Sequence, residues 1–512
     1  MMISNQFLRN LNYKKNNMKI KLQFLAAIIL LSLVSNAQYQ TGKKTITYTD
    51  PDRNNRQIET VIYYPSTTGG TDAAIASGQF PAIIFGHGTA MADPNLYLYF
   101  LEALPTYGYI VLFPTTESAS PPIASPNHEA FGLDLKFLNL KIKSENTNSG
   151  SLFFNHVTDK TAIIGHSLGG KATLIGAANN NEVTTIVTLC AALSNPPWPY
   201  GGGYDAITNS IPYITVPSLV VDAEFDCVVE SDAGRHLTYE LLNVDCKTYV
   251  SINGGGHCYM ASSDASSCET AEGWMGGNCE SSFTISREQQ NQTVLDILLP
   301  YFGYYLLEDE ASYSEFLCYI TTSNAVISER SCDLPDAEIS GIDINNVVED
   351  ITVPYGTSLS TATNLLAQQI TIDDIYGVTH NVNLSWSVSG YNGNIAGDYN
   401  ASGNFNLPAC IVQTSPPTNL NVEATITVEE NTSGIPLLQI NGISLYPNPI
   451  SDFLFYDKSE ISDDNYLEIY NIYGELILRE YIENKGSINL SNLSSGMYMI
   501  KVRDSYLKLI KN

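Results

Sequence analysis

An apolar run in this chain ends at a serine set between glycines, and this arrangement restricts how the chain can fold. Residues 161–170 read Thr-Ala-Ile-Ile-Gly-His-Ser-Leu-Gly-Gly, a Gly-x-Ser-x-Gly pattern centred on Ser167. This is the form of a nucleophile elbow, in which a buried strand turns sharply into a helix. The flanking positions lack side chains because the two backbones pass close together. Lys160–Ile164 can form the strand and Leu168–Ala178 the helix, so we predict a catalytic serine at Ser167.

The pattern around this motif alternates strands with helices from residue 44 to about 325. Strands are predicted at Arg56–Tyr64, Pro81–Gly86, Tyr109–Phe113, Thr184–Cys190, Ser218–Ala223 and Lys247–Ile252. Helices are predicted at Leu96–Leu104 and from the capping box Ser286-x-x-Gln289 to about Leu307. Apolar strands separated by helices are typical of a parallel sheet covered on both faces. The sequence therefore predicts an α/β domain over residues 38–330.

The N-terminus and the net charge indicate where the protein acts. Lysines precede the apolar run Leu22–Val34, and Ser35-Asn36-Ala37 supplies small residues for cleavage. This order predicts a secretory signal peptide over residues 1–37, with Met18 as a possible second start. The run is too short for a transmembrane span. Lys+Arg 25 against Asp+Glu 53 gives a net charge of −28, which disfavours nucleic acid and anionic lipid as partners.

Nine cysteines in an exported chain indicate disulfides. Local pairs are expected at Cys227–Cys246, Cys268–Cys279 and Cys318–Cys332, although spacing alone leaves the connectivity open. Cys190 and Cys410 stand apart and are expected to be buried thiols. No Cys-x-x-Cys pair or histidine cluster supports a zinc site. We expect no metal and no cofactor.

A catalytic serine needs a base, and the base needs an orienting acid. In this fold the acid and then the histidine follow the serine in chain order. Asp226 lies a few residues beyond an apolar strand and is the favoured acid, with Asp222 and Asp232 as alternatives. His257 follows the next strand after a glycine run, and it is the predicted base because the other histidines fall in the wrong places.

The oxyanion of an acyl-transfer intermediate needs backbone N–H donors. One donor is expected from Leu168, the residue after the nucleophile. The other is expected from the glycine-containing loop after an early strand, at Thr89 or alternatively at Gly88. Gly88, His166 and Trp198 are the candidate substrate-binding residues, and Trp198 is either a stacking platform or a packed loop residue.

The chain changes character after Cys332, and two further domains are predicted. Residues 336–432 have short alternating runs rich in Thr, Val, Asn and Gly, and they resemble bacterial immunoglobulin-like modules that act as spacers or as carbohydrate or surface binders. Residues 440–512 contain Tyr446-Pro-Asn-Pro and end with Ser495-Gly-Met-Tyr before a final strand. They resemble the C-terminal sorting domain of the Bacteroidetes type IX secretion pathway. That resemblance implies export through the type IX machinery.

The elbow, the Phe85–Thr89 loop, Asp226 and the Ile252–His257 stretch together resemble the secreted polyester hydrolase and cutinase family, which extends to dienelactone-hydrolase-like esterases. The resemblance implies an α/β-hydrolase domain, here followed by two small all-β domains. It implies that Ser167, Asp226 and His257 are nucleophile, acid and base. The chain departs from the family's aromatic-x-Ser-Met-Gly elbow at His166 and Leu168.

These features predict a secreted, monomeric serine ester hydrolase acting through an acyl-enzyme, with polyesters among its substrates. Small or cell-wall-linked esters are the alternative substrates. A secreted peptidase is a second alternative, because amide hydrolysis shares the acyl chemistry. A third is a surface-binding protein in which the hydrolase domain is only a scaffold.

Overall fold

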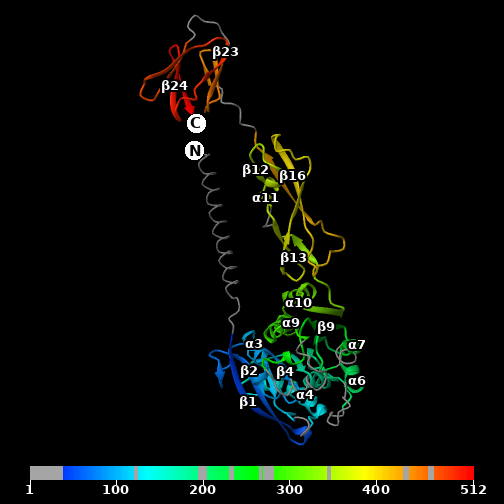
Figure 1. Cartoon of the computed structure of the whole chain (residues 1–512). Helices are drawn as coiled ribbons and strands as arrows, with labels where there is room; N and C mark the ends of the chain where they lie inside the picture. Colours follow the sequence, from blue (N-terminus) through cyan, green and yellow to red (C-terminus); the bar gives the residue numbers. More distant parts are fainter. Residues whose placement is uncertain are drawn as a thin grey trace, which may run out of the picture. The chain divides into compact units, whose positions relative to one another are not determined.

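A computed structural model describes residues 39–119, 125–193, 204–229, 236–263, 268, 282–342, 348–430, 438–458 and 466–512 (Figure 1). The predicted signal peptide, Asp232 and Trp198 lie outside these residues. The chain divides into two compact units. The first holds the described residues up to Ile342 together with 371–381 and 407–418, and the second holds the remainder. Among the described helices, none combines the length and the apolar character that crossing a bilayer requires.

The first unit is built on a ten-stranded mixed sheet with strand order β10-β9-β8-β7-β6-β4-β5-β2-β1-β3. Its strands are β1 (Gln40–Asp50), β2 (Arg56–Ser66), β3 (Gly70–Thr71), β4 (Phe80–Gly86), β5 (Ile110–Pro114), β6 (Val157–His166), β7 (Thr185–Leu189), β8 (Ser218–Ala223), β9 (Cys246–Ile252) and β10 (Val326–Cys332). In this order, the neighbours β5, β4, β6, β7, β8 and β9 pair in parallel. At the two sides of this parallel core, β2 pairs antiparallel with β5 and β10 pairs antiparallel with β9. Parallel strands end at the same edge, so the residues after β4, β6, β7, β8 and β9 meet there.

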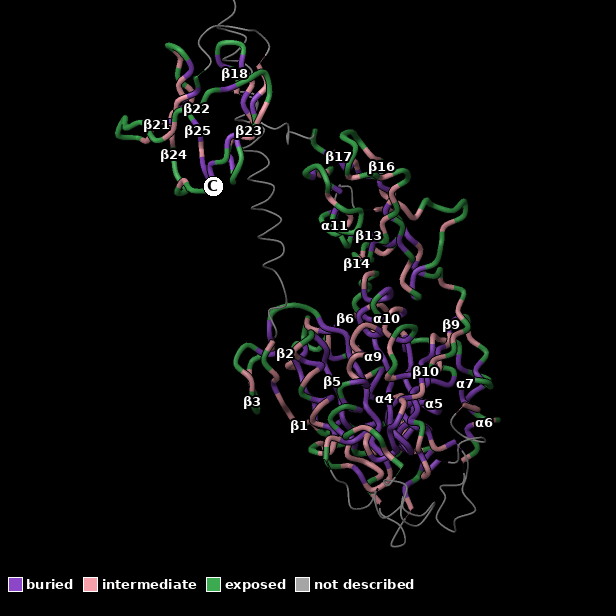
Figure 2. The backbone as a smooth tube through the Cα atoms, turned by 45° about the horizontal axis from the view of Figure 1, so that its top comes forward, coloured by how far each residue is buried: buried purple, intermediate pink, exposed green. Residues whose placement is uncertain are grey.

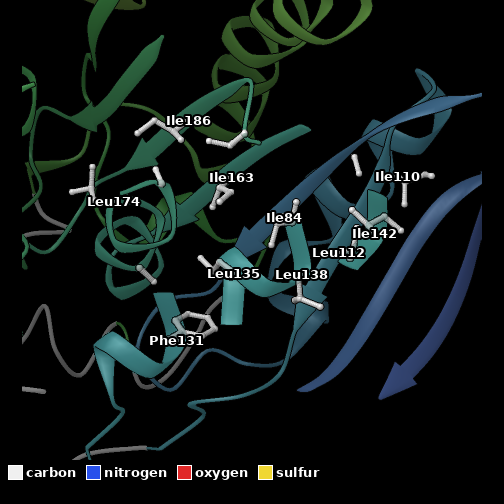
Figure 3. Close-up of a cluster of buried hydrophobic side chains, with 14 of the residues drawn as sticks. Ile84, Ile110, Leu112, Phe131, Leu135, Leu138, Ile142, Ile163, Leu174 and Ile186 are labelled. Carbon is white, nitrogen blue, oxygen red and sulfur yellow. The ribbon is translucent and has the colours of Figure 1, made fainter. Parts of the chain in front are cut away.

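Helices cover both faces of this sheet. The described helical segments of the unit are η1 (Pro51–Arg53), η2 (Pro94–Tyr97), α2 (Leu98–Leu101), α3 (Ala103–Thr106), α4 (His128–Glu145), α5 (Leu168–Ala177), α6 (Ala206–Asn209), η3 (Ile211–Tyr213), α7 (His236–Leu241), η5 (Cys258–Met260), α9 (Arg287–Leu307) and α10 (Glu310–Thr322). On one face, α4 and α5 bury Phe131, Leu135 and Leu174 against Ile84 and Ile163 of the sheet (Figure 3). On the other, Phe85 packs on Phe100 of α2, and Thr185 bonds Tyr301 of α9. Figure 2 shows that the central strands are buried almost throughout.

The predicted strands of the α/β domain are observed within one or two residues of their expected bounds, except that the elbow strand extends to Val157–His166. The capping box at Ser286 and Gln289 is present, and its helix ends at Leu307 as expected. The predicted helix Leu96–Leu104 is wrong in detail. It is divided into η2, α2 and α3, and Pro105 inside α3 lacks the N–H that a continuous helix would use.

Small sheets follow the α/β core. A three-stranded sheet has the order β11-β13-β14, from Ile339–Ile342, Gln369–Asp374 and Thr379–Asn383. A four-stranded sheet has the order β12-β17-β16-β15, from Ile351–Val353, Asn421–Val428, Gly397–Asn404 and Ser385–Val388. The predicted antiparallel pattern is incomplete, because β12 pairs parallel with β17 and a helix, α11 (Leu359–Leu365), precedes β13. The immunoglobulin-like assignment stays a prediction.

The C-terminal region contains two four-stranded sheets with a shared apolar core. One has the order β18-β19-β20-β23, from Leu438–Ile440, Ile443–Tyr446, Phe453–Lys458 and Lys485–Asn489. The other has the order β22-β21-β24-β25, from Leu476–Tyr481, Tyr466–Tyr470, Gly496–Val502 and Ser505–Lys511. All these pairs are antiparallel. The compact β domain expected at the C-terminus is therefore observed.

The expected disulfide pairs are wrong. The structure has Cys246–Cys332, Cys258–Cys268 and Cys318–Cys410, and Cys227 is also disulfide-bonded. Cys246 and Cys332 face each other because β9 and β10 pair antiparallel in that register. Cys190 is a buried thiol as expected, but Cys410 is not.

The Cys318–Cys410 bond joins α10 to residues 407–418 within the first unit. Buried Ser314 of the same helix donates a hydrogen bond to Asp374, which also pairs with His380 at 2.8 Å. The first unit therefore includes two segments that follow the predicted domain end at residue 330.

Candidate active site

Ser167 lies at the sharp turn between β6 and α5, as the glycine pattern predicted. Its φ of 57° and ψ of −113° place a non-glycine residue in a rarely occupied backbone region, as is common at functional sites. The turn is held on both sides, because Ser167 N–H donates to Leu189 at 2.9 Å and Ala192 N–H donates to the Ser167 carbonyl at 3.1 Å. The residue is 8% exposed, and its hydroxyl forms no hydrogen bond with a described residue.

The glycines around Ser167 are required by close backbone approach. A Cβ on Gly165 would lie 2.1 Å from the carbonyl oxygen of Gly169, and a Cβ on Gly169 would lie 2.0 Å from that of Gly86. Real Cβ atoms do not approach backbone oxygens so closely. The elbow and the end of β4 are thus packed backbone against backbone, which fixes the serine relative to the loop after Gly86.

His257 and Asp226 form a buried pair at the same edge of the sheet. His257 Nδ1 lies 2.7 Å from Asp226 Oδ2, and the two residues are 1% and 4% exposed. Asp226 also accepts from the N–H groups of Val228 and Val229 at 2.9 and 3.0 Å. Asp226 is therefore the carboxylate bonded to His257, whereas the alternative Asp222 is a buried residue within β8 itself.

The loop that carries His257 is clamped by the first turns of α9, a feature that the sequence analysis did not anticipate. Gln290 makes two bonds to Gly256, accepting from its N–H and donating to its carbonyl, both at 2.9 Å. Arg287 donates to the Cys258 carbonyl at 2.6 Å, and Asn291 donates to the Tyr259 carbonyl at 2.7 Å. Positions 287, 290 and 291 share one helix face. The capping box at Ser286 marks where this helix begins, and it was the available sequence signal for the clamp.

The glycine run before His257 is explained by these neighbours. A Cβ on Gly255 would lie 2.3 Å from Gln290 Oε1, and one on Gly256 would lie 1.9 Å from the ring of Phe283. In the sequence, the run served to locate His257 after the strand. In the structure it lets the loop backbone pack closely against α9 and Phe283.

The loop after β4 turns tightly beside the elbow. Met91 N–H donates to the Gly88 carbonyl at 3.0 Å, and Ala90 has a φ of 59°. Gly88 N–H donates to the Tyr97 hydroxyl at 3.0 Å, so this alternative oxyanion donor is already engaged. Among the described residues, the N–H groups of Thr89 and Leu168 have no hydrogen-bond acceptor. Those two amides are the expected donors.

His87, at the base of this loop, is a second residue that the sequence analysis left without a role. It is fully buried, with Nδ1 2.8 Å from the Gly88 carbonyl and Nε2 2.9 Å from the Thr116 carbonyl. Burial, as the largest effect, lowers the pKa of His87. The neutral ring lies between the Gly88 and Thr116 carbonyls and can donate to one of them at a time.

The three candidate substrate-binding residues have different outcomes. His166 is fully buried, and its ring centroid lies 4.7 Å from that of His257. Burial first, and then the neighbouring His257, hold the pKa of His166 well below its ordinary value. Gly88 is also buried, and substrate binding by either residue stays a prediction. Trp198 falls outside the described residues.

Cys190 completes the buried surroundings of the pair. It follows β7 with a φ of 47°, and its sulfur, an Asp226 oxygen and a His257 ring nitrogen all lie within 4.8 Å of one another. Sulfur, nitrogen and oxygen can all bind a metal, but this pair already uses Nδ1 and Oδ2 for its own hydrogen bond. We therefore assign Cys190 to the packing around the acid.

Comparison with known protein families agrees with this architecture. Two family models match this chain, and together with the sheet they define a secreted hydrolase. The chain belongs to the PET hydrolase-like family, whose model matches residues 40–333, more than half of the sequence. Residues 444–512 match the secretion system C-terminal sorting domain, which indicates export to the cell surface or beyond. A search of curated proteins finds no sequence similar to this chain.

Proposed function

We propose that this protein is a serine ester hydrolase that works through an acyl-enzyme. The observation that carries the proposal is the buried His257–Asp226 pair, with its 2.7 Å bond, at the sheet edge where the strained Ser167 elbow ends β6. A buried carboxylate beside Nδ1 keeps the hydrogen on that nitrogen, which leaves Nε2 to accept a proton from serine.

The chemistry follows from these positions. His257 removes the proton from Ser167 as the serine oxygen attacks the ester carbonyl, and Asp226 stabilises the imidazolium that forms. The amides of Leu168 and Thr89 donate to the oxyanion. His257 then protonates the leaving alcohol, and the base-activated attack of water releases the acid and restores Ser167. The hydroxyl and the ring are not hydrogen-bonded to each other here, as is common before substrate is bound.

Polyesters are the proposed substrate class, and the family match supports this choice. Small soluble esters are the alternative substrate class. The test is therefore a turnover screen over short p-nitrophenyl esters, matched anilides and amorphous polyester film. We expect ester and film hydrolysis, with anilides cleaved far more slowly. Faster cleavage of anilides than of esters would favour a peptidase instead.

The nucleophile is tested by Ser167→Ala. Loss of the serine typically removes about 10⁶-fold in kcat in such enzymes, so residual turnover should fall to background while the folded structure is retained. A matched control is Ser218→Ala, which removes a buried hydroxyl that bonds only the carbonyl of Val216 in the described structure. Ser167→Ala protein with wild-type activity would end the proposal.

A further inference from the structure

The hydroxyl of Tyr97 lies where the oxyanion loop and the elbow meet. It accepts the Gly88 N–H at 3.0 Å and lies 2.9 Å from His166 Nδ1. A Cβ on Gly88 would lie 3.3 Å from that hydroxyl and 3.2 Å from His166 Nδ1, so three groups from three segments converge. The ring of Tyr97 is fully buried, with Phe85 and Phe113 at centroid distances of 4.7 and 5.9 Å.

The directions of these hydrogen bonds can be assigned from donor and acceptor counts. The Gly88 N–H can only donate, so the Tyr97 oxygen accepts it. The hydroxyl proton then has two acceptors within reach: His166 Nδ1 at 2.9 Å and Met91 Sδ at 3.6 Å. A thioether is the weaker acceptor and is farther away. We therefore assign the hydroxyl proton to His166 Nδ1, and in this assignment His166 carries its own hydrogen on Nε2.

The protonation states agree with this assignment. Burial raises the pKa of Tyr97, so the hydroxyl keeps its proton. Among the residues that the structure describes, the titratable groups acting on His166 are Tyr97, His87 and His257. Burial, and then the two neighbouring histidines, lower the pKa of His166, so its ring is neutral and Nδ1 is an acceptor.

His166 also contacts the predicted base. The two ring centroids are 4.7 Å apart at an interplanar angle of 45°. Since His257 must take up a proton during acyl transfer, a charged neighbour would oppose that step, whereas a neutral ring does not. Tyr97 therefore bonds on one side to the loop that supplies Thr89 and on the other to the ring that packs against His257.

We propose, resting on the function above, that Tyr97 is a positioning residue that acts through two contacts: it fixes the oxyanion loop at Gly88 and holds an uncharged His166 against His257. This gives His166 a role in supporting the base rather than in touching substrate. Tyr97 itself touches no reacting atom.

The test compares two tyrosines that lie two residues apart. Tyr97→Phe removes the bridging hydroxyl. Tyr99→Phe is the matched control, because its buried hydroxyl has no hydrogen-bond partner among the described residues. We expect Tyr97→Phe to lower kcat for a soluble ester by about tenfold, the effect of losing up to two hydrogen bonds, with KM changed less than twofold. Tyr99→Phe should keep both constants within twofold.

Variants of His166 separate positioning from folding. His166→Gln keeps a neutral acceptor for the Tyr97 hydroxyl, and we expect about threefold loss or less, whereas His166→Leu should lose as much as Tyr97→Phe. The double variant Tyr97→Phe/His166→Leu should lose less than the product of the two single losses. Thermal unfolding of every variant excludes a folding defect as the cause.

The outcomes also separate this assignment from the function on which it rests. Activity retained in Ser167→Ala overturns the proposed function and this assignment with it. If Ser167→Ala is inactive, then unchanged kcat in Tyr97→Phe, equal losses in Tyr97→Phe and Tyr99→Phe, or fully multiplicative losses in the double variant each overturn the assignment alone.

Discussion

Replacing Asp226 with asparagine tests the acid–base pair most directly. The substitution keeps the size of the side chain and removes its charge. The new amide can also present its NH₂ group to His257 Nδ1, which would favour the tautomer with the hydrogen on Nε2. That tautomer cannot accept the serine proton. Both effects weaken the transition state for acylation, while substrate binding is left nearly unchanged.

The magnitude can be worked from the geometry. Nδ1 and Oδ2 are 2.7 Å apart, and both charges are delocalised, so their centres are about 4 Å apart. At an effective dielectric constant of about 20, an imidazolium and a carboxylate at that separation attract by about 4 kcal/mol. A tenfold change in rate corresponds to about 1.4 kcal/mol, so the loss of this attraction predicts about a thousandfold lower kcat.

The assay is steady-state hydrolysis of a soluble p-nitrophenyl ester, with Asp222→Asn as the matched control. Asp222 is the alternative acid on the same strand-to-loop segment and is also buried. We expect Asp222→Asn to keep kcat within about fivefold, because its carboxylate is not the one bonded to His257 Nδ1. Near-normal kcat in folded Asp226→Asn, or a larger loss in Asp222→Asn, would refute the reasoning.

Two further predictions concern the surroundings of the site. Gln290→Ala removes both bonds to Gly256 and should lower kcat at least tenfold and the free energy of unfolding by about 2 kcal/mol. Gln292→Ala, on the exposed side of α9, should change neither quantity. If the two variants showed equal changes in urea unfolding and in kcat, the clamp would be contradicted. Burial first, then the charge of Lys171, lowers the pKa of His128 to about 4. The unfolded chain takes up this proton near pH 6.5 and the folded chain only near pH 4, so unfolding free energy should fall by about 3 kcal/mol across that interval. In His128→Asn the fall should be smaller by that amount, and parallel stability curves for the two proteins would show that His128 is not responsible.

The local sequence predicted what depends on local chemistry. The elbow at Ser167 was recognisable because glycine is needed on both sides of a turn that brings β4, β6 and α5 into backbone contact. Strands of the parallel core were recognisable because they are apolar on both faces. The order of strands then placed Asp226 and His257 after β8 and β9, where the structure brings them together.

What escaped prediction depends on pairing between distant segments. Cys246 was expected to pair locally, but it bonds Cys332, 86 residues away, because β10 returns antiparallel to β9. A strand such as β10, with alternating exposed and half-buried residues, gives a weak signal in sequence. The roles of Tyr97 and Gln290 were hidden for a similar reason. Each acts through a backbone group that only the fold brings near.

The Cys318–Cys410 bond has a practical consequence for anyone who produces or dissects this enzyme. The family match ends at residue 333, and the obvious truncation there would discard Cys410 and Asp374. Such a fragment would carry an orphan thiol on α10 and would leave Ser314 without its acceptor. Conversely, a protease that nicks the chain once between residues 333 and 406 cannot shed the 407–418 segment, because it stays covalently attached. The first compact unit is therefore bounded by its crosslink rather than by the end of the family match.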